Sequence, residues 1–284
     1  MKTWSAAVLI AVAVAVASGC GQQDDHAQQM PQEEINAENN LAANPPISEA
    51  PNAAEAPEEP SNPADDNQAS TETDGENAPA EEDVVAKSYH MNKNFFIKPN
   101  DENGNKKVVL LTFDDGPKEE ALLVKILDTL DKHQAKAIFF VNGFRVKAKP
   151  ELLKLIDERG QIIGNHSYDH IILKNLPEEK IDQQLGDVQT IVQETIGKRP
   201  QFFRPPNGAG NDYVRAKAKE LGMLYMTWSN GSLDWADNRN NPEGVIASVM
   251  KQLAPGSNIL MHELEWTAEA LDDLLTKLEE AGYG

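Results

Sequence analysis

The sequence predicts an α/β fold for residues 89–284, a parallel sheet covered by helices and rolled into a closed or partly closed barrel. Apolar runs of strand length alternate here with segments whose apolar residues recur at helical spacing. Repeated strand–helix units of this kind build parallel sheets. Their number favours a barrel over an open sheet, and such barrels place their chemistry at the carboxyl ends of the strands.

The expected strands begin with a hairpin. A strong turn signal, Asn103-Gly104, separates the apolar residues 95–97 from the apolar run within 107–113, so we expect these two segments to pair. Further β-rich or apolar runs predict strands at 137–141, 161–164, 201–203, 223–228 and 258–261.

The expected helices occupy the intervals between these strands. The segment 119–133 carries Leu123, Ile126, Leu127 and Leu130 at helical spacing. The segment 150–158 starts with proline and ends before Gly160, as helices commonly do. Similar reasoning predicts helices at 177–196, 212–221, 242–253 and 266–280.

Residues 1–20 are typical of an export signal. Lys2 precedes an apolar run at 6–17, which is too short to span a membrane comfortably and has the length of a signal-peptide core. Small residues then lead to Cys20, the only cysteine, in a pattern that resembles a bacterial lipobox. The resemblance implies cleavage before Cys20 and its lipidation; the alternative is a plain secretory signal. Both imply export.

Residues 21–88 have the composition of a disordered linker. They contain eight prolines, no aromatic residue, and 17 acidic residues against one lysine, so most of the formal net charge of −20 lies here. Such a segment buries too little apolar surface to fold. With a lipid anchor it would hold the domain at the bacterial cell surface, on the outer face of the cytoplasmic membrane. The charge argues against a nucleic-acid partner, and one cysteine excludes an intrachain disulfide framework.

Polar residues follow the predicted strands at the points where these end. Because the carboxyl ends of parallel strands meet at one end of a barrel, we expect the side chains to share a site. They are Asp114 and Asp115 after the first strand, His166, Arg204, Asp234 after the 223–228 strand, and His262.

The pair His166 and His170 can bind one cation, since histidines four residues apart can lie on one face. A carboxylate from another strand would complete a set of two histidines and one acid, which leaves open positions for water and substrate. Gly116-Pro117 ends the first strand, so we expect Asp114 and Asp115 to face the same pocket. One can bind the metal, and the other can act as a base.

Five motifs in this order resemble the polysaccharide deacetylase family (NodB homology, carbohydrate esterase family four) over about residues 105–284. They are TFDDGP at 112–117, HSYDH at 166–170, FRPPNG at 203–208, LDW at 233–235 and ILMH at 259–262. The resemblance implies a deformed (β/α) barrel and a metal-dependent hydrolase of linear amides that removes acetyl groups from a glycan, with a metal-activated water as nucleophile.

The resemblance also implies residue roles. Asp114 matches the general base and His262 the general acid; Arg204 orients the base, and Asp234 holds the acid. The metal ligands are Asp115, His166 and His170, for Zn²⁺ or alternatively Co²⁺, Ni²⁺ or Mn²⁺. Trp235 and Leu260 match walls of the acetyl pocket, and the backbone N–H of Asn207 matches an oxyanion donor.

The chain departs from the family pattern at four places. Asn207 replaces a common Tyr, Gly231 an Asp, and Glu263 an Asp. Relatives usually continue into one more short strand, so we expect the barrel to lack its last strand and to expose an edge strand after the last helix. The expected substrate is N-acetylglucosamine in peptidoglycan. The alternatives are chitin or xylan oligosaccharides, a non-catalytic glycan-binding module, and another metal hydrolase such as a phosphoesterase.

Overall fold

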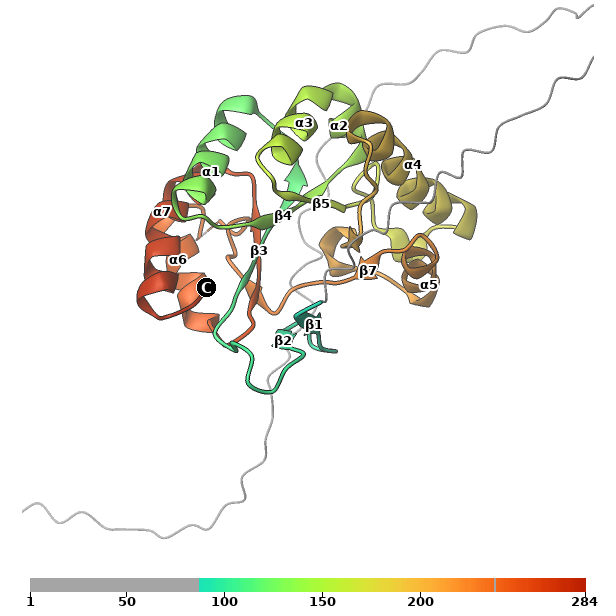
Figure 1. Cartoon of the computed structure of the whole chain (residues 1–284). Coiled ribbons are helices and arrows are strands. Elements are labelled where there is room, and N and C mark those ends of the chain that lie inside the picture. Colours follow the sequence, from blue (N-terminus) through green and yellow to red (C-terminus); the bar gives the residue numbers. More distant parts are fainter. Residues whose placement is uncertain (1–86, 238) are drawn as a thin grey trace, which may run out of the picture. The chain divides into compact units, whose positions relative to one another are not determined.

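The computed structural model describes residues 87–237 and 239–284 (Figure 1). The predicted signal peptide at 1–20, its lipidation site Cys20 and all but the last two residues of the predicted linker lie outside these ranges. Within them, the helices are too short or too polar to cross a membrane.

A curled sheet of seven parallel strands forms the centre of the fold (Figure 1). Its order is β7-β6-β5-β4-β3-β9-β8, so β7 and β8 are the two edges and the sheet is a half-barrel. The predicted deformed barrel is thereby confirmed. The strands are β3 (Leu110–Gly116), β4 (Ala137–Val141), β5 (Ile162–Asn165), β6 (Phe202–Phe203), β7 (Leu224–Tyr225), β8 (Asn230–Gly231) and β9 (Asn258–His262).

Within the described residues, seven helices surround the sheet, and six of them were predicted to within a few residues. The exception is α2 (Gly143–Ala148), whose six residues bury only Gly143 and Val146, too few to show a helical period. The seven helices are α1 (Glu120–Lys132), α2 (Gly143–Ala148), α3 (Pro150–Glu158), α4 (Glu178–Ile196), α5 (Asp212–Glu220), α6 (Pro242–Gln252) and α7 (Glu265–Glu280). Short 3-10 turns lie at Leu173–Asn175 and Pro206–Gly208.

Strand β4 shows how the sheet divides the core. Phe139 faces the main cluster under the helices, where its ring stacks on Phe113 at 5.1 Å. Its neighbours Ile138 and Phe140 point the other way, as alternation along a strand requires, and pack with Met226 inside the half-barrel. A side chain at Gly164 would collide with Phe140, so the glycine makes room for this ring beneath the site.

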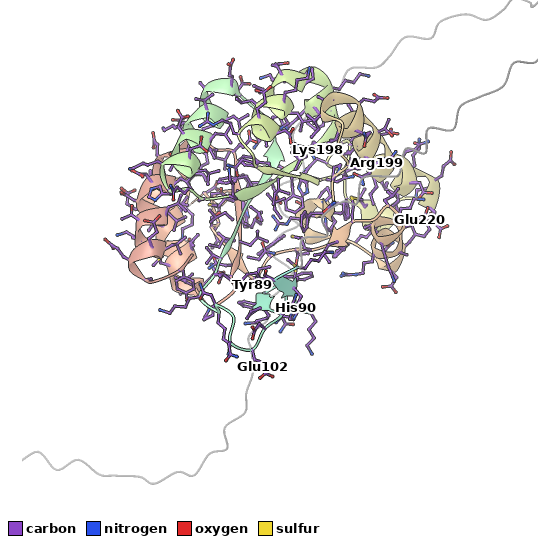
Figure 2. The ribbon with its side chains drawn as sticks, in the orientation of Figure 1. Tyr89, His90, Glu102, Lys198, Arg199 and Glu220 are labelled. Carbon is purple, nitrogen blue, oxygen red and sulfur yellow. The ribbon has the colours of Figure 1, made fainter. Side chains whose placement is uncertain are left out.

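The predicted hairpin around Asn103-Gly104 is wrong. The hairpin that forms pairs β1 (Tyr89–Met91) with β2 (Ile97–Pro99), and Tyr89 and His90 lie on it in Figure 2. Strand β3 is hydrogen-bonded to β4 on one side and to β9 on the other. It therefore has no edge left to accept β2, and residues 100–109 form the connection.

The predicted strand at 223–228 is also wrong in extent. Its first part is β7, at one edge of the sheet, and the chain then crosses to β8 at the other edge. The crossing is anchored at both sides, because the N–H of Met226 donates to Phe203 and that of Ser229 donates to Asn258. The open edges are thus β7 and β8, and not a strand next to the last helix. Gly284 instead hydrogen-bonds to the backbone of Lys107 and Val109.

Candidate active site

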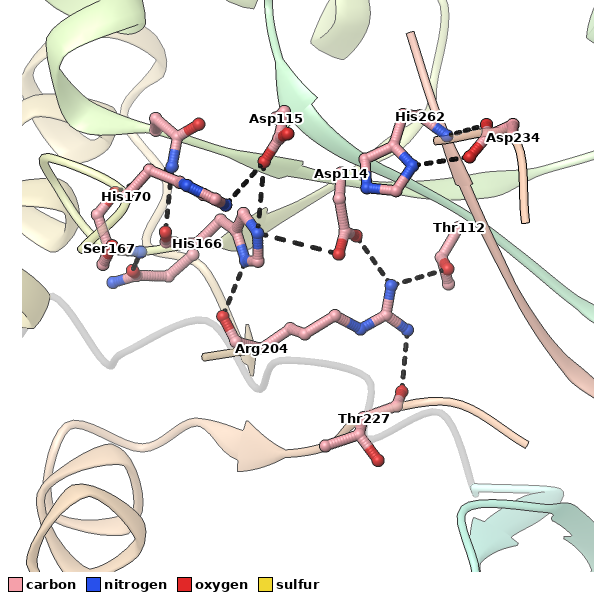
Figure 3. A network of polar contacts seen from close by, with 12 residues as sticks. Thr112, Asp114, Asp115, His166, Ser167, His170, Arg204, Thr227, Asp234 and His262 are labelled. Atoms are coloured by element: carbon pink, nitrogen blue, oxygen red, sulfur yellow. Dashed lines mark hydrogen bonds and ion pairs between the residues drawn. The ribbon is translucent and has the colours of Figure 1, made fainter. Parts of the chain in front are cut away.

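The carboxyl ends of the strands bring the predicted polar residues together (Figure 3). Asp114 and Asp115 lie on β3, and His262 is the last residue of β9. His166 and Arg204 follow β5 and β6 directly. Asp234 comes from a different strand than predicted: it follows β8, which neighbours β9, and not β7 at the far edge.

A bulge in β3 turns Asp115 toward the histidines. The strand stops before Pro117, as expected, but it runs through Asp114 and Asp115 to Gly116, beyond the predicted bound at 113. Its register against β4 shifts between Phe113 and Gly116, and Asp115 has a φ of 65°. Bulges next to active sites commonly re-aim a side chain in this way. Five of the seven non-glycine residues with positive φ in the described ranges belong to the predicted motifs: Asp115, Ser167, His170, Asn207 and Leu233. Such strain concentrates at functional sites.

Asp115, His166 and His170 form a triad suited to a metal ion. One ligand atom from each lies within 4.8 Å of the others. Oδ1 of Asp115 is 3.0 Å from Nε2 of His170 and 3.3 Å from Nε2 of His166, yet this buried oxygen has no hydrogen-bond partner among the described residues. Burial raises the pKa of Asp115, but the two histidines outweigh this effect and hold the pKa well below its ordinary value. An ionised, unpartnered oxygen facing two imidazoles fits a cation.

The orientation of His166 supports the same interpretation. Its Nδ1 lies 2.7 Å from the carbonyl oxygen of Arg204, which only an N–H can satisfy. Nδ1 therefore carries a proton, and Nε2, which faces Asp115, is the nitrogen available to a metal, as in histidines that bind metals. The side chain of His166 is 3% exposed, whereas that of His170 is 33% exposed, so the triad opens to solvent on one side.

Asp114 and Arg204 form a buried ion pair beside this triad. Nη1 of Arg204 lies 2.6 Å from Oδ1 of Asp114, and the guanidinium stacks 4.4 Å above the ring of Phe140. Burial lowers the pKa of Arg204, and Asp114 opposes this. Oδ2 of Asp114 lies 3.7 Å from Nε2 of His166, so the second oxygen faces the triad. Three further acceptors hold the guanidinium: Thr112 Oγ1 at 2.8 Å, the Thr227 carbonyl at 2.8 Å and Asn258 Oδ1 at 3.2 Å.

Asp234 and His262 form a second pair. Nδ1 of His262 lies 2.8 Å from Oδ1 of Asp234, and Oδ2 accepts hydrogen bonds from the His262 N–H and from Thr267. Burial lowers the pKa of His262, but Asp234, with smaller effects of Asp114 and Asp115, raises it above its ordinary value. Burial raises the pKa of Asp234, but His262 and Thr267 lower it overall. The pair therefore favours a protonated imidazole beside an ionised carboxylate.

The remaining predicted residues lie around these groups. Trp235 is 48% exposed and packs edge-on against the ring of His262, 5.3 Å between centroids. Leu260 is buried on β9, and because side chains alternate along a strand it shares a face with His262. Asn207 is exposed with a φ of 56°, a left-handed conformation that Asn adopts more readily than most residues.

Sequence reasoning missed the residues that hold the charged groups in place. Thr112 accepts from Arg204 and donates to Ile259, and Asn258 bonds both Arg204 and the Thr227 carbonyl. Thr267 lies in α7 and donates to Asp234. Threonine and asparagine at such positions carry no pattern of their own, so only the fold reveals these contacts.

The comparisons with known proteins decide the family. The model of the polysaccharide deacetylase family matches residues 101–226. The peptidoglycan-N-acetylglucosamine deacetylase of Bacillus cereus is 35% identical over 187 residues, which cover 63% of this chain and 85% of that protein. This chain belongs to the polysaccharide deacetylase family. The peptidoglycan-N-acetylmuramic acid deacetylase PdaC of Bacillus subtilis is 39% identical over 180 residues, but the match covers 63% of this chain and 37% of PdaC. The chain thus spans little more than a third of that relative.

Solved structures of this deacetylase family share the fold. The structure of PdaC has a TM-score of 0.58 and 38% identity, and covers 63% of this chain and 86% of that one. BA3943 of Bacillus anthracis, described as a family pseudoenzyme, has a TM-score of 0.60 at 36% identity and covers 63% of each chain. Fold likeness therefore does not separate active members from inactive ones, and the side chains at the site must.

Proposed function

We propose that this polysaccharide deacetylase family member is a metal-dependent hydrolase that removes acetyl groups from the N-acetylated sugars of peptidoglycan. One observation carries the proposal: a metal triad and two acid–base pairs stand together at the carboxyl end of the half-barrel (Figure 3). The names of the B. cereus enzyme and of PdaC support the substrate class.

Asp115, His166 and His170 would hold the metal, and we propose Zn²⁺. Two imidazoles and one carboxylate are a common catalytic zinc set. When bound, the ion would polarise the acetyl carbonyl and lower the pKa of a water molecule. Because His170 and Asp115 are partly exposed, substrate can reach this side of the triad.

Asp114 serves as the general base in this scheme. Arg204 fixes one of its oxygens, which leaves Oδ2 on the side of the triad to accept a proton from the attacking water. As the oxygen of water bonds to the acetyl carbon, the carbon–nitrogen bond breaks. Because an amide anion is a very poor leaving group, the departing nitrogen needs a proton.

His262 supplies that proton. Nδ1 is held by Asp234, so Nε2 is the nitrogen available to the substrate. Asp234 raises the pKa of His262, which keeps the imidazole protonated until the amine leaves. The products are acetate and a free amine on the sugar. Trp235 and Leu260 would enclose the acetyl methyl group beside this histidine.

The acetylated sugar is proposed to be N-acetylglucosamine, which the name of the B. cereus enzyme supports, and the alternative is N-acetylmuramic acid, which the name of PdaC supports. A glycan-binding module without activity is a second candidate, because a pseudoenzyme shares the fold at similar identity. The retained acids and histidines argue against it, since glycan binding alone requires neither pair.

The deciding experiment is acetate release by the purified chain from peptidoglycan, chitooligosaccharides and acetylated xylan, with metal chelated and then restored. We expect release from peptidoglycan that requires metal and is abolished in D114N. The matched control is D101N, an exposed aspartate in the loop before β3. Glycan retention without acetate release, unaffected by D114N, would favour the binding module.

We also propose that the chain is exported and anchored by lipid at Cys20 to the outer face of the cytoplasmic membrane, with residues 21–88 as a spacer. The support is the sequence pattern alone. Mass spectrometry of the amino-terminal peptide tests it. A diacylated Cys20 is expected, and a soluble mature chain that starts elsewhere would contradict it. In C20A the protein should leave the membrane fraction.

A further inference from the structure

Glu263 is a buried acid that the mechanism above does not use. It follows His262 directly and is 1% exposed. Oε2 accepts a hydrogen bond of 2.9 Å from the N–H of Lys118, whereas Oε1 is buried and finds no hydrogen-bond partner in the part of the chain that the structure describes. Leaving a buried carboxylate oxygen unpaired is costly. Nor does an ion pair offset this cost, since within residues 87–237 and 239–284 no side-chain nitrogen of a lysine or arginine lies within 4.0 Å of the carboxylate oxygens of Glu263.

Both carboxylate oxygens of Glu263 contact the turn that follows Asp115. A side chain at Gly116 would occupy the place of Oε1, so the glycine backbone lies directly against this oxygen. Two residues further on, Lys118 donates to Oε2. The carboxylate thus contacts the turn at two points, one and three residues after the aspartate of the triad.

The backbone of the turn is held as well, since the Gly116 carbonyl accepts from the N–H of Asn142 and the Lys118 carbonyl accepts from Nζ of Lys149. Asp115 adopts a positive φ at the bulge, where the pairing of β3 with β4 is interrupted. Asp115 therefore lacks the regular strand pairing of its neighbours, since Asp114 pairs with β9 and Gly116 pairs with β4. Burial raises the pKa of Glu263 to about 7, with Lys118 and Arg145 lowering it, so an uncharged amide of the same shape is a fair substitute.

We propose that Glu263 is a positioning residue, which holds the bulged turn so that Asp115 faces His166 and His170 and thereby sets the metal affinity of the triad. This inference rests on the metal site of the proposed function. It also gives a role to a residue that differs from the family pattern: Glu is one methylene longer than Asp, and this length brings the carboxylate up to Gly116 and Lys118.

The test compares E263Q, E263D and E263A in the full chain, with Zn²⁺ affinity measured by calorimetric titration and stability by thermal unfolding. The affinity of E263A should fall about 10–100-fold, the usual cost of losing a residue that supports a metal ligand. E263Q keeps the shape and an acceptor for Lys118, so it should stay within a few-fold of wild type. E263D withdraws the carboxylate and should fall between these two.

The matched control is Q189A, which removes another buried polar side chain, one that donates to the backbone of Pro200. It should lower the melting temperature and leave Zn²⁺ affinity unchanged. If E263A binds Zn²⁺ as tightly as wild type, Glu263 is only a packing residue. If E263Q loses as much affinity as E263A, Glu263 acts through its charge and not by holding the turn, which also overturns the proposal. If E263A does not fold, E263D decides: unchanged affinity overturns the proposal. Wild type that binds Zn²⁺ but releases no acetate would overturn the proposed function alone.

Discussion

Nη1 of Arg204 lies 2.6 Å from Oδ1 of Asp114, and both side chains are shielded from solvent. The same guanidinium bonds Thr112 on β3, Asn258 on β9 and the Thr227 carbonyl. Thr227 belongs to the segment that crosses from β7 to β8. One arginine therefore both orients the proposed base and ties together the two sides of the half-barrel, so its loss should affect activity and stability together.

We expect R204M to be strongly destabilised and D114N/R204M to recover part of that loss. Removing one partner of a buried pair costs about 3–5 kcal/mol, because it leaves an uncompensated charge. In the double variant neither charge remains. Urea unfolding of wild type, both single variants and the double variant gives the coupling energy.

Acetate release separates the two roles in the same variants. D114N should lower kcat by about 10²–10⁴-fold, the range expected for loss of a general base. The double variant should regain stability and remain inactive. Additive stability changes in the cycle would show that the pair is not coupled.

His170 is the ligand of choice for testing the metal site. Its side chain is 33% exposed, whereas His166 is almost fully buried, so H170Q should fold while removing one ligand. We expect its Zn²⁺ affinity to fall by more than the roughly 10–100-fold seen for supporting residues. H90Q, which changes an exposed histidine of β1, should bind Zn²⁺ as wild type does. Equal affinities in the two variants would exclude His170 as a ligand.

The sequence predicted which residues meet at the site but not how each is aimed. Strand ends are visible in apolar patterns, so Asp114, His166, Arg204 and His262 could be placed in advance. The conformation of Asp115 could not, because a bulge depends on pairing with β4 and leaves no mark in the composition of the strand.

The remaining features depend on pairing between strands that are distant in the sequence, which local patterns do not predict. Asp234 was assigned to the strand at 223–228, since nothing local shows that the chain leaves one edge of the sheet and joins the other. The hairpin failed for a related reason: Asn103-Gly104 is a sound local turn signal, but β3 is paired on both sides by segments distant in sequence. Local patterns specify elements, whereas packing decides which of them pair.

The pH dependence of kcat/KM should depend on Asp234. A general acid must be protonated, so activity falls as pH rises through the pKa of His262, which Asp234 raises. D234N removes that negative charge, and we expect the alkaline limb to move to lower pH. Profiles of initial rate against pH for both proteins would measure the shift. An unchanged limb in an active D234N would mean that another group is the acid.

Thr267 offers a milder version of the same test. Its hydroxyl donates to Asp234 at 2.7 Å, and this bond helps to keep the carboxylate ionised. T267V should lower kcat/KM and change its pH profile. T276V removes an exposed threonine of the same helix, whose hydroxyl bonds the carbonyl of Asp272, and should behave as wild type. Matching profiles in the two valine variants would show that Thr267 does not act through Asp234.

His133 should make the stability of the domain depend on pH. At the end of α1 it places Nε2 2.7 Å from Asp272 and Nδ1 2.8 Å from Glu279, both on α7. Two carboxylates can be satisfied only if both ring nitrogens carry protons. Contact with Asp272 raises the pKa of His133; burial lowers it, and Glu279 raises it again, for a net increase.

A pKa raised in the folded state gives stability that is fully present below the unfolded value of about 6.5 and is lost as pH rises through the folded value. Urea unfolding of wild type and H133Q at a series of pH values should therefore show an advantage of wild type at low pH that shrinks as pH rises. Salt should reduce it, since both carboxylates are about half exposed to solvent. H90Q is the control and should follow wild type throughout. A constant difference between wild type and H133Q would mean that His133 contributes packing and not charge, because only the charged contacts disappear when the imidazole loses its proton.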